Sequence, residues 1–196
     1  AFANDVATIA GEAGHRLFHI MIPKVESVDD VLLAERALER ASAAHVPLHV
    51  LIESPAAVQR AFDIAAHPRV QSLSFGLMDF VSAHGGAIPA QAMTSAGQFT
   101  HPLVVRAKLE IASACHAHGK VPSHCVVTEF SDMAALQGAA GRASRELGYT
   151  RMWSIHPAQI RTILQAFAPQ QDDIDSASRI IAAAALADWA PISVDW

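Results

Sequence analysis

The chain has 196 residues, of which 52% are hydrophobic and 17% are charged, and its formal net charge is -5. This length allows one well-packed core, and the apolar content argues against intrinsic disorder. The sequence contains no run of lysines and arginines, which speaks against nucleic-acid binding. The most apolar stretch, residues 180–186, is far shorter than the roughly 20 residues of a membrane span. We therefore expect a globular domain with neither nucleic acid nor a membrane as partner.

The cysteine content and the first residues bear on the cellular compartment. Two cysteines, Cys115 and Cys125, are too few for a disulfide framework, and their spacing does not match a zinc site. Residues 1–5 lack the positive charge and apolar stretch that begin a signal peptide. These features predict a reducing, cytoplasmic environment.

Short apolar runs alternate with longer amphipathic segments along the first half of the chain. Residues 17–22 predict a strand, and residues 28–44 a helix with Ser27 as its N-cap. A strand over 48–52 is followed by a helix that begins at Pro55, and residues 70–75 predict a third strand. Residues 76–100 are rich in glycine and serine and predict a loop with at most a short helix.

The same alternation continues to the end of the chain. A helix over 101–118 is closed by Gly119, and residues 120–127 predict the fourth strand. A helix over 132–147 precedes a fifth strand over 151–155, a helix that begins at Pro157 and a last helix over 172–187. Five apolar strands separated by helices are typical of an α/β fold with a parallel sheet. No linker divides the sequence, so we expect residues 1–196 to form a single domain.

Polar residues follow four of the predicted strands, at the end where parallel α/β folds bind ligands. They are Lys24 and Glu26 after the first strand, Glu53 after the second, Asp79 after the third and His156 after the fifth. Glu53 directly follows an apolar run, so its carboxylate must be paired, protonated or bound to a cation. Two carboxylates from neighbouring strands are suited to hold Mg²⁺, with water and substrate oxygens completing its coordination.

The spacing alone leaves other interpretations open for each of these residues. Glu53 could pair with a lysine or arginine, and Asp79 could cap a helix. Lys24 and Glu26 could be an active-site pair or the start of the next helix, and His156 could belong to an ordinary turn between a strand and a helix.

Taken together, the segments at the strand ends resemble a known family. They are PKVES at residues 23–27, IESP at 52–55, FGLMDF at 75–80, IHPAQI at 155–160 and FAP at 167–169. In this order they resemble the HpcH/HpaI aldolase/citrate lyase superfamily, on the side of the proteins similar to the citrate lyase beta subunit. The resemblance covers residues 15–188.

The resemblance implies a (β/α)8 TIM barrel and a Mg²⁺-dependent carbon–carbon lyase that acts through an enolate. The implied substrates are hydroxyacyl-CoA or related thioesters of the citryl, malyl or citramalyl type. By motif match, Glu53 and Asp79 would be the catalytic metal ligands. Gly76, Leu77 and Met78 would hold the substrate carboxylate, with Lys24 and His156 as further substrate contacts.

The chain also departs from the family pattern. A complete barrel needs about 250 residues, and this sequence matches only about the last five βα units. The family's arginine on an early strand has no counterpart here, since Arg106, Arg142 and Arg151 lie in helices or at the start of a strand. We therefore expect a partial TIM barrel. It is either a fragment of a longer parent chain, which we favour, or a divergent short member of the family.

Three further expectations follow from the resemblance. The alternatives to a thioester lyase are a 2-keto-acid aldolase of the same superfamily and a non-catalytic metal-binding relative or fragment. Lys24 favours the citrate lyase-like branch, because the aldolases usually carry glutamine in that motif. Relatives form trimers or hexamers, so we expect a homo-oligomer, and Ile180, Ile181 and Leu186 of the last helix could serve its interface or pack on the barrel.

Overall fold

The structure, a computed structural model, describes residues 2–193. By internal contacts the chain forms two compact units, Ala1–Ala166 and Phe167–Trp196. Each unit is described by itself below. The prediction of a single domain over residues 1–196 stays a prediction.

A parallel sheet of five strands forms the centre of the larger unit. Its strands are β1 (Ile20–Ile22), β2 (Leu48–Ile52), β3 (Val70–Phe75), β4 (Val121–His124) and β5 (Arg151–Met152). Their order in the sheet is their order in the chain, and every neighbouring pair is parallel. Such an order is that of consecutive βα units in a (β/α)8 barrel. The predicted α/β class with a parallel sheet is confirmed.

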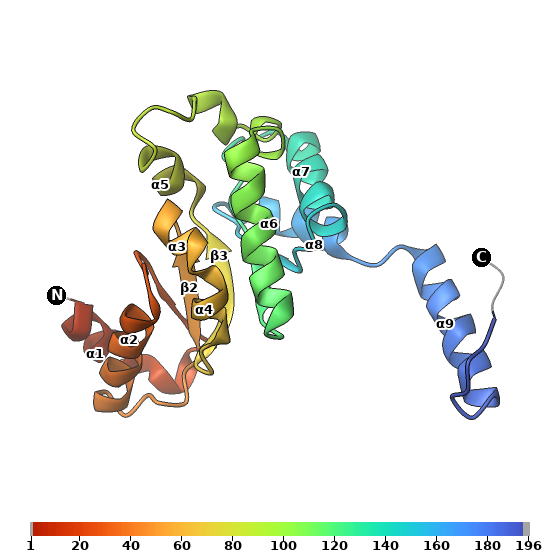
Figure 1. The fold of residues 1–196 in the computed structure, drawn as a ribbon, viewed down its shortest axis with the longest axis horizontal. Helices are drawn as coiled ribbons and strands as arrows, with labels where there is room; N and C mark the ends of the chain where they lie inside the picture. The colour runs from red at the N-terminus through yellow and green to blue at the C-terminus, as the bar shows by residue number, and fades with distance from the viewer. Residues whose placement is uncertain (1, 194–196) are drawn as a thin grey trace. The chain divides into compact units, whose positions relative to one another are not determined.

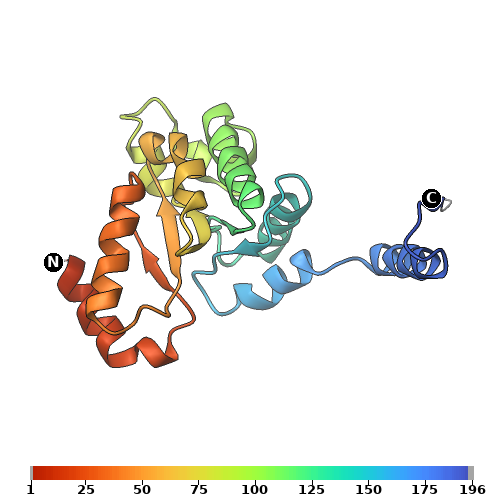
Figure 2. The ribbon, with the colours of Figure 1, turned by 60° about the horizontal axis from the view of Figure 1, so that its bottom comes forward.

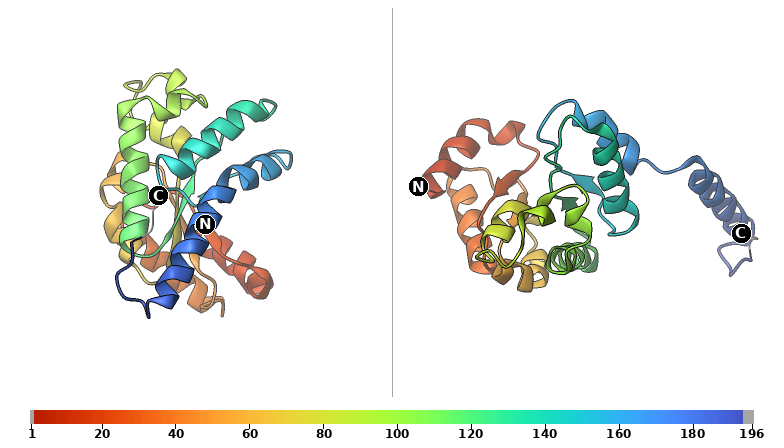
Figure 3. Two further views of the ribbon diagram at one scale, coloured as in Figure 1. Left: turned by 90° about the vertical axis from the view of Figure 1, so that its right-hand side faces the viewer. Right: turned by 90° about the horizontal axis from the view of Figure 1, so that it is seen from above.

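Helix α1 precedes β1, and helices follow each of the five strands. They are α1 (Phe2–Ala13), α2 (Val28–Arg40), α3 (Pro55–Gln59), α4 (Ala61–Ala66), α5 (Leu77–Ser82), α6 (Pro102–Ala117), α7 (Met133–Arg145) and α8 (Gln159–Phe167). Short 3-10 helices occur at Gly14–Arg16, Ala90–Met93 and Gly97–Phe99. Helices α4 and α6 pack against β3 and against each other. Figures 1 and 2 show α2, α4 and α6 along the strands, and Figure 3 shows the helices arranged in an arc around them.

The two faces of the sheet differ in composition because successive residues of a strand point to opposite faces. Leu48, Val50 and Ile52 belong to the buried core shared with the helices. We call the face of the sheet that carries these three side chains the outer face. His49, Leu51 and Glu53 alternate with them and lie on the opposite, inner face.

The strand register extends the inner face across the sheet. His49 is paired with Ser72, and Leu51 with Ser74. Ser74 is paired in turn with Ser123 on β4. Ser72, Ser74 and Ser123 are all buried, so the inner face carries a row of buried polar side chains below the strand ends.

Several predicted boundaries differ from the structure. The first strand begins at Ile20 rather than at residue 17, and the fourth ends at His124 rather than at 127. Helix α2 ends at Arg40 and not at 44, because Ser42 takes a left-handed conformation (φ 57°) that ends a helix. Ser27 does precede α2, and its backbone N–H donates to Asp30 at 3.0 Å.

One helix of the larger unit was not predicted, and another was predicted only in part. Helix α1 was not predicted, and it packs on α2 through Val6 and Ala10. The short helix expected within residues 76–100 is α5, which begins directly after Gly76.

The second unit contains the helix α9 (Gln171–Leu186), within a residue of its predicted bounds. Each of its side chains is at least partly exposed, including Ile181 at 58% and Leu186 at 91%. Among the helices formed by residues 2–193, none combines the length and apolar composition that a membrane crossing requires.

Candidate active site

A cavity of about 190 Å³ lies at the carboxyl ends of β2, β3 and β4. Five of the seven predicted site residues line it, and they come from the ends of β2 and β3. The lining consists of Leu51, Glu53, Phe75, Gly76, Leu77, Met78, Asp79, Cys125, Val126 and Trp153. The walls are thus mostly apolar, and the two carboxylates supply the negative charge.

Glu53 is nearly buried, at 6% exposure, although it carries a carboxylate. Its Oε1 accepts a hydrogen bond from the backbone N–H of Lys24 at 2.7 Å. Burial raises the pKa of the Glu53 carboxyl, the Lys24 N–H acts against this rise, and the negative charge of Asp79 adds to it. The two carboxylates are therefore close enough to repel each other, and a cation between them would relieve that repulsion.

Gly76 permits the close packing of the β3–α5 turn on Glu53. A Cβ atom at position 76 would lie 2.5 Å from Cβ and 2.9 Å from Oε2 of Glu53. The backbone N–H of Gly76 donates to the carbonyl of Ile52 at 2.8 Å, which ties the turn to the end of β2. Glycine is thus the residue that this turn requires beside the carboxylate.

Asp79 lies in the first turn of α5, whose N-cap is Gly76. Its Oδ1 is 3.4 Å from Nζ of Lys24, and both side chains are more than half exposed. An exposed pair of this kind contributes about 0–1 kcal/mol. A stronger interaction of the Asp79 carboxylate, such as one with a divalent cation, could therefore replace this pair at little cost.

Lys24 contacts both carboxylates, one with its backbone and one with its side chain. Its left-handed conformation (φ 54°) accompanies the backbone N–H bond to Glu53. Lys24 itself lines a neighbouring hollow of about 250 Å³ at the end of β1. Glu26 does not pair with Lys24, because its Oε2 accepts from the hydroxyl of Ser54 at 2.7 Å.

His156 lies outside the lining of the cavity, in the loop after β5. It is exposed, and its Nδ1 accepts from the backbone N–H of Ala158 at 3.2 Å. This is the geometry of a turn between a strand and a helix, one of the two interpretations that the sequence left open. Its predicted contact with substrate stays a prediction.

Sequence reasoning missed Cys125, Val126 and Trp153 as cavity residues. Trp153 comes from the same loop as His156. It follows Arg151 by two positions, so strand alternation places Trp153 on the same face of the sheet as Arg151. Cys125 follows Ser123 in the same way. The strand register determines which of these residues reach the cavity, and the sequence alone does not give that register.

The arginines considered from the sequence all lie away from the cavity. Arg106 pairs with Glu110 at 2.7 Å, and Arg151 donates to Ser72 at 3.4 Å. No arginine is among the cavity-lining residues of the described chain. Within residues 2–193, no group of three or more His, Cys, Asp or Glu side chains is arranged to hold a metal ion.

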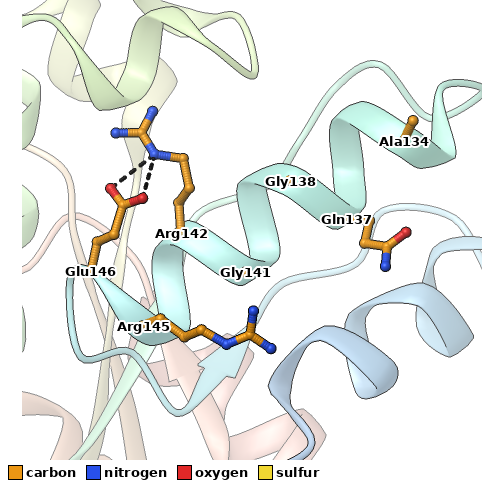
Figure 4. Close-up of a pocket in the computed structure, with 7 residues that line it drawn as sticks. All are labelled: Ala134, Gln137, Gly138, Gly141, Arg142, Arg145 and Glu146. Atoms are coloured by element: carbon orange, nitrogen blue, oxygen red, sulfur yellow. Dashed lines mark hydrogen bonds and ion pairs between the residues drawn. The ribbon is translucent and has the colours of Figure 1, made fainter. Parts of the chain in front are cut away.

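A larger hollow of about 430 Å³ lies on the surface of α7. Small residues, among them Ala134, Gly138 and Gly141, form its floor. Figure 4 shows Arg142 paired with Glu146, while Arg145 extends from the other side of the helix. Because an open surface of one helix supplies all of its lining, the hollow is a shallow groove rather than a site built from several elements.

Comparison with known proteins identifies the family. The model of the HpcH/HpaI aldolase/citrate lyase family matches residues 3–157, and the chain belongs to this family. The sequence is 34% identical over 194 residues to an L-malyl-CoA/beta-methylmalyl-CoA lyase of Cereibacter sphaeroides. That match covers 91% of this chain and 60% of the relative, so the chain spans less than two thirds of its length.

Solved structures show the same fold. A citrate lyase from Burkholderia xenovorans matches with a TM-score of 0.88 and 50% identity, covering 98% of this chain and 62% of that one. CitE of Mycobacterium tuberculosis, in complex with magnesium and pyruvate, matches with a TM-score of 0.69 and 26% identity, covering 86% and 64%. The predicted fold class, five βα units of a TIM barrel, is confirmed.

Proposed function

We propose that this chain is a Mg²⁺-dependent carbon–carbon lyase that cleaves or forms a hydroxyacyl-CoA or related thioester of the citryl, malyl or citramalyl type. The observation that carries the proposal is the pair of carboxylates in one small cavity. Glu53 is nearly buried there; burial raises the pKa of its carboxyl, and the charge of Asp79 adds to that rise. Membership of the citrate lyase family and the likeness to malyl-CoA lyases support the choice of reaction.

The donor set fits Mg²⁺. One oxygen of Glu53 is held by the backbone N–H of Lys24, which leaves the other oxygen for a cation. The carboxylate of Asp79 pairs with the exposed ammonium of Lys24, an interaction that a cation can replace. Two hard carboxylate donors, with water and substrate oxygens completing the coordination, are a common arrangement for Mg²⁺. CitE, a relative in the same fold, contains magnesium together with pyruvate.

When bound, Mg²⁺ would supply positive charge beside the oxygen on which negative charge develops as the C–C bond breaks. The chain's own contribution is to hold the acid fragment of the substrate. The first backbone N–H groups of a helix lack intrahelical partners, so those of Leu77 and Met78 are suited to a substrate carboxylate. The apolar walls at Leu51, Val126 and Trp153 exclude water from the reacting carbons.

The proposal is tested by Mg²⁺ binding and by cleavage. Calorimetric titration should show Mg²⁺ binding that Glu53→Gln and Asp79→Asn each weaken by about 10-fold or more, since each removes one charged ligand. Release of acetyl-CoA from malyl-CoA should fall in parallel. Asp63→Asn, which neutralises an exposed carboxylate on α4 outside the cavity, serves as the matched control. Unchanged Mg²⁺ affinity in both cavity variants would exclude the proposed metal site.

A second candidate is a metal-binding relative without lyase activity. It is favoured by the lack of an arginine among the cavity residues of the described chain, because such a group would bind a substrate carboxylate bidentately. Mg²⁺ binding that is sensitive to Glu53→Gln, with no cleavage of malyl-, citramalyl- or citryl-CoA, would select this candidate.

A further inference from the structure

A buried lysine lies next to the wall of the cavity. Lys108 of α6 is fully buried, and its Nζ is 4.0 Å from the centre of the Phe99 ring. Nζ donates a hydrogen bond to Oε1 of Gln98 at 2.7 Å. No carboxylate in residues 2–193 forms an ion pair with it. Lysines are almost never fully buried without a charged partner, so a functional reason is expected.

Gln98 connects Lys108 to Cys125, a residue of the cavity wall. The Sγ of Cys125 donates to the same Oε1 of Gln98 at 3.1 Å. Gln98 is fully buried, and its Nε2 has no hydrogen-bond partner among residues 2–193. One amide oxygen thus accepts from a thiol and from an ammonium group, and positive charge lies beside a thiol that lines the cavity.

Cys125 is 1% exposed, and burial and the charge of Lys108 act in opposite directions on the pKa of its thiol. Burial lowers the pKa of Lys108 to about 8, so the amine is still mostly protonated at pH 7. Burial raises the pKa of the Cys125 thiol, while the charge of Lys108 acts in the opposite direction. A thiolate formed there would be stabilised by the adjacent ammonium.

The neighbouring titratable groups do not supply a competing negative charge. Burial keeps His124 neutral by lowering its pKa, and keeps the phenol of Tyr149 protonated by raising its pKa. The guanidinium of Arg142 lies 4.6 Å from the centre of the Phe99 ring and adds positive charge.

We propose that Cys125 is the proton donor to the carbon fragment released in the lyase reaction, with Lys108 and Gln98 as positioning residues. This inference rests on the function proposed above. When the C–C bond breaks, its electron pair remains on the α-carbon of the thioester fragment as an enolate. The S–H bond of Cys125 breaks as the new C–H bond forms. The proton of the substrate hydroxyl passes to solvent as the C–C bond breaks. The Cys125 thiolate takes a proton from solvent before the next turnover, so no proton is gained or lost overall.

In the reverse direction the thiolate of Cys125 would remove a proton from acetyl-CoA, and this step can be measured by itself. Wild type with Mg²⁺ is incubated with acetyl-CoA in D₂O, and deuterium in the acetyl group is followed by mass spectrometry. Cys125→Ala should reduce exchange by about 10²-fold or more, the usual contribution of a general acid or base. Cys115→Ala, at a buried cysteine of α6 outside the cavity, should leave it unchanged.

Lys108 and Cys125 are further tested by the reactivity of the thiol. Iodoacetamide should alkylate Cys125 faster than Cys115, whose pKa burial raises to about 12. Lys108→Met should slow alkylation of Cys125 by about 10-fold, one pKa unit of lost stabilisation of the thiolate. Mg²⁺ with pyruvate should protect Cys125 by filling the cavity. Equal reactivity in wild type and Lys108→Met would overturn the inference.

The outcomes separate this inference from the proposed function. A wild type that cleaves no thioester removes the proposed function, and the proton-donor role with it. A wild type that cleaves malyl-CoA while Cys125→Ala keeps full kcat overturns the proton-donor role alone. Cys125→Ser, close to cysteine in size, guards against a folding defect. We expect it to keep the wild-type circular dichroism spectrum and KM while its kcat falls.

Discussion

The outer and inner faces of the sheet are made by alternate residues of the same strands, yet they differ in chemistry. On β2 and β3 the outer face carries Ile52 and Leu73, which pack against helices and are fully buried. The inner face carries His49 and Ser74, and buried polar atoms such as His49 Nε2 lack hydrogen-bond partners among the described residues. Substitutions on the outer face should therefore lower stability. Substitutions on the inner face should change the pH dependence of stability or the binding of a ligand.

The largest expected effect is on the outer face. Leu73→Ala would leave a cavity among fully buried side chains and should cost about 2–5 kcal/mol of unfolding free energy. Ser74→Ala, one residue along on the inner face, loses only the hydroxyl bond to the carbonyl of Ser123 and should cost about 1 kcal/mol. Urea unfolding measures both. Equal losses of unfolding free energy in the two variants would show that the two faces contribute equally to stability.

The second prediction concerns the pH dependence of stability, to which His49 on the inner face should contribute together with the buried His124. Its pKa is lowered to about 4, mainly by burial, with smaller contributions from the charges of His19 and Arg151. The unfolded chain binds this proton more tightly, with a pKa near 6.5, so the stability from neutral His49 is present above that pH. It is lost as the pH falls towards 4, and the loss amounts to about 3 kcal/mol.

The comparison of variants isolates this effect from that of other groups. Urea midpoints at pH 7 and pH 4 should differ less in His49→Gln than in wild type, and the remaining difference should come from groups such as the buried His124. His156→Gln, at an exposed histidine after β5, should behave as wild type does. A His49→Gln variant with the full wild-type pH dependence would assign the loss to other groups.

A third prediction concerns the end of the inner face, where the backbone and Glu53 are in contact. In Gly76→Ala the new methyl group would lie 2.5 Å from Cβ of Glu53, so the carboxylate must shift. We expect a cost of about 1–3 kcal/mol from overpacking and a Mg²⁺ affinity lowered by about 10-fold. In the control Gly138→Ala the methyl group meets open space on α7, and stability should rise by about 0.5–1 kcal/mol. Calorimetry and urea unfolding check both.

The sequence predicts best those features that are local along the chain. Strands β2 and β3 were predicted with their observed bounds, because an apolar run ends in each case at a polar residue or at glycine. Glu53 was singled out for the same reason, since a carboxylate directly after a buried run is unusual. Helix α1 was not predicted, because only Val6 and Ala10 of its residues are buried and the apolar pattern is correspondingly weak.

Features that depend on pairing across the sheet could not be predicted in the same way. Trp153 and Cys125 reach the cavity because of the strand register, and their apolar character gives no signal of a site. Lys108 lies in the middle of α6, where a lysine is normally exposed. Only the packing of Phe99 and Gln98 around it reveals a buried cation.

The smallest expected effect lies outside both faces, on the exposed side of α6. Arg106 and Glu110 form a pair one helical turn apart, at 2.7 Å, with the arginine side chain 63% exposed. In Glu110→Gln the loss should be about 0.3–0.5 kcal/mol, and 1 M salt should abolish the difference from wild type because ions screen exposed charges. A loss above about 1 kcal/mol that persists in 1 M salt would mean that this pair is not a surface interaction. Because Glu110 lies on the same helix as Lys108 and is partly exposed rather than buried, the variant also calibrates how much of the response to Lys108→Met is due to α6 itself.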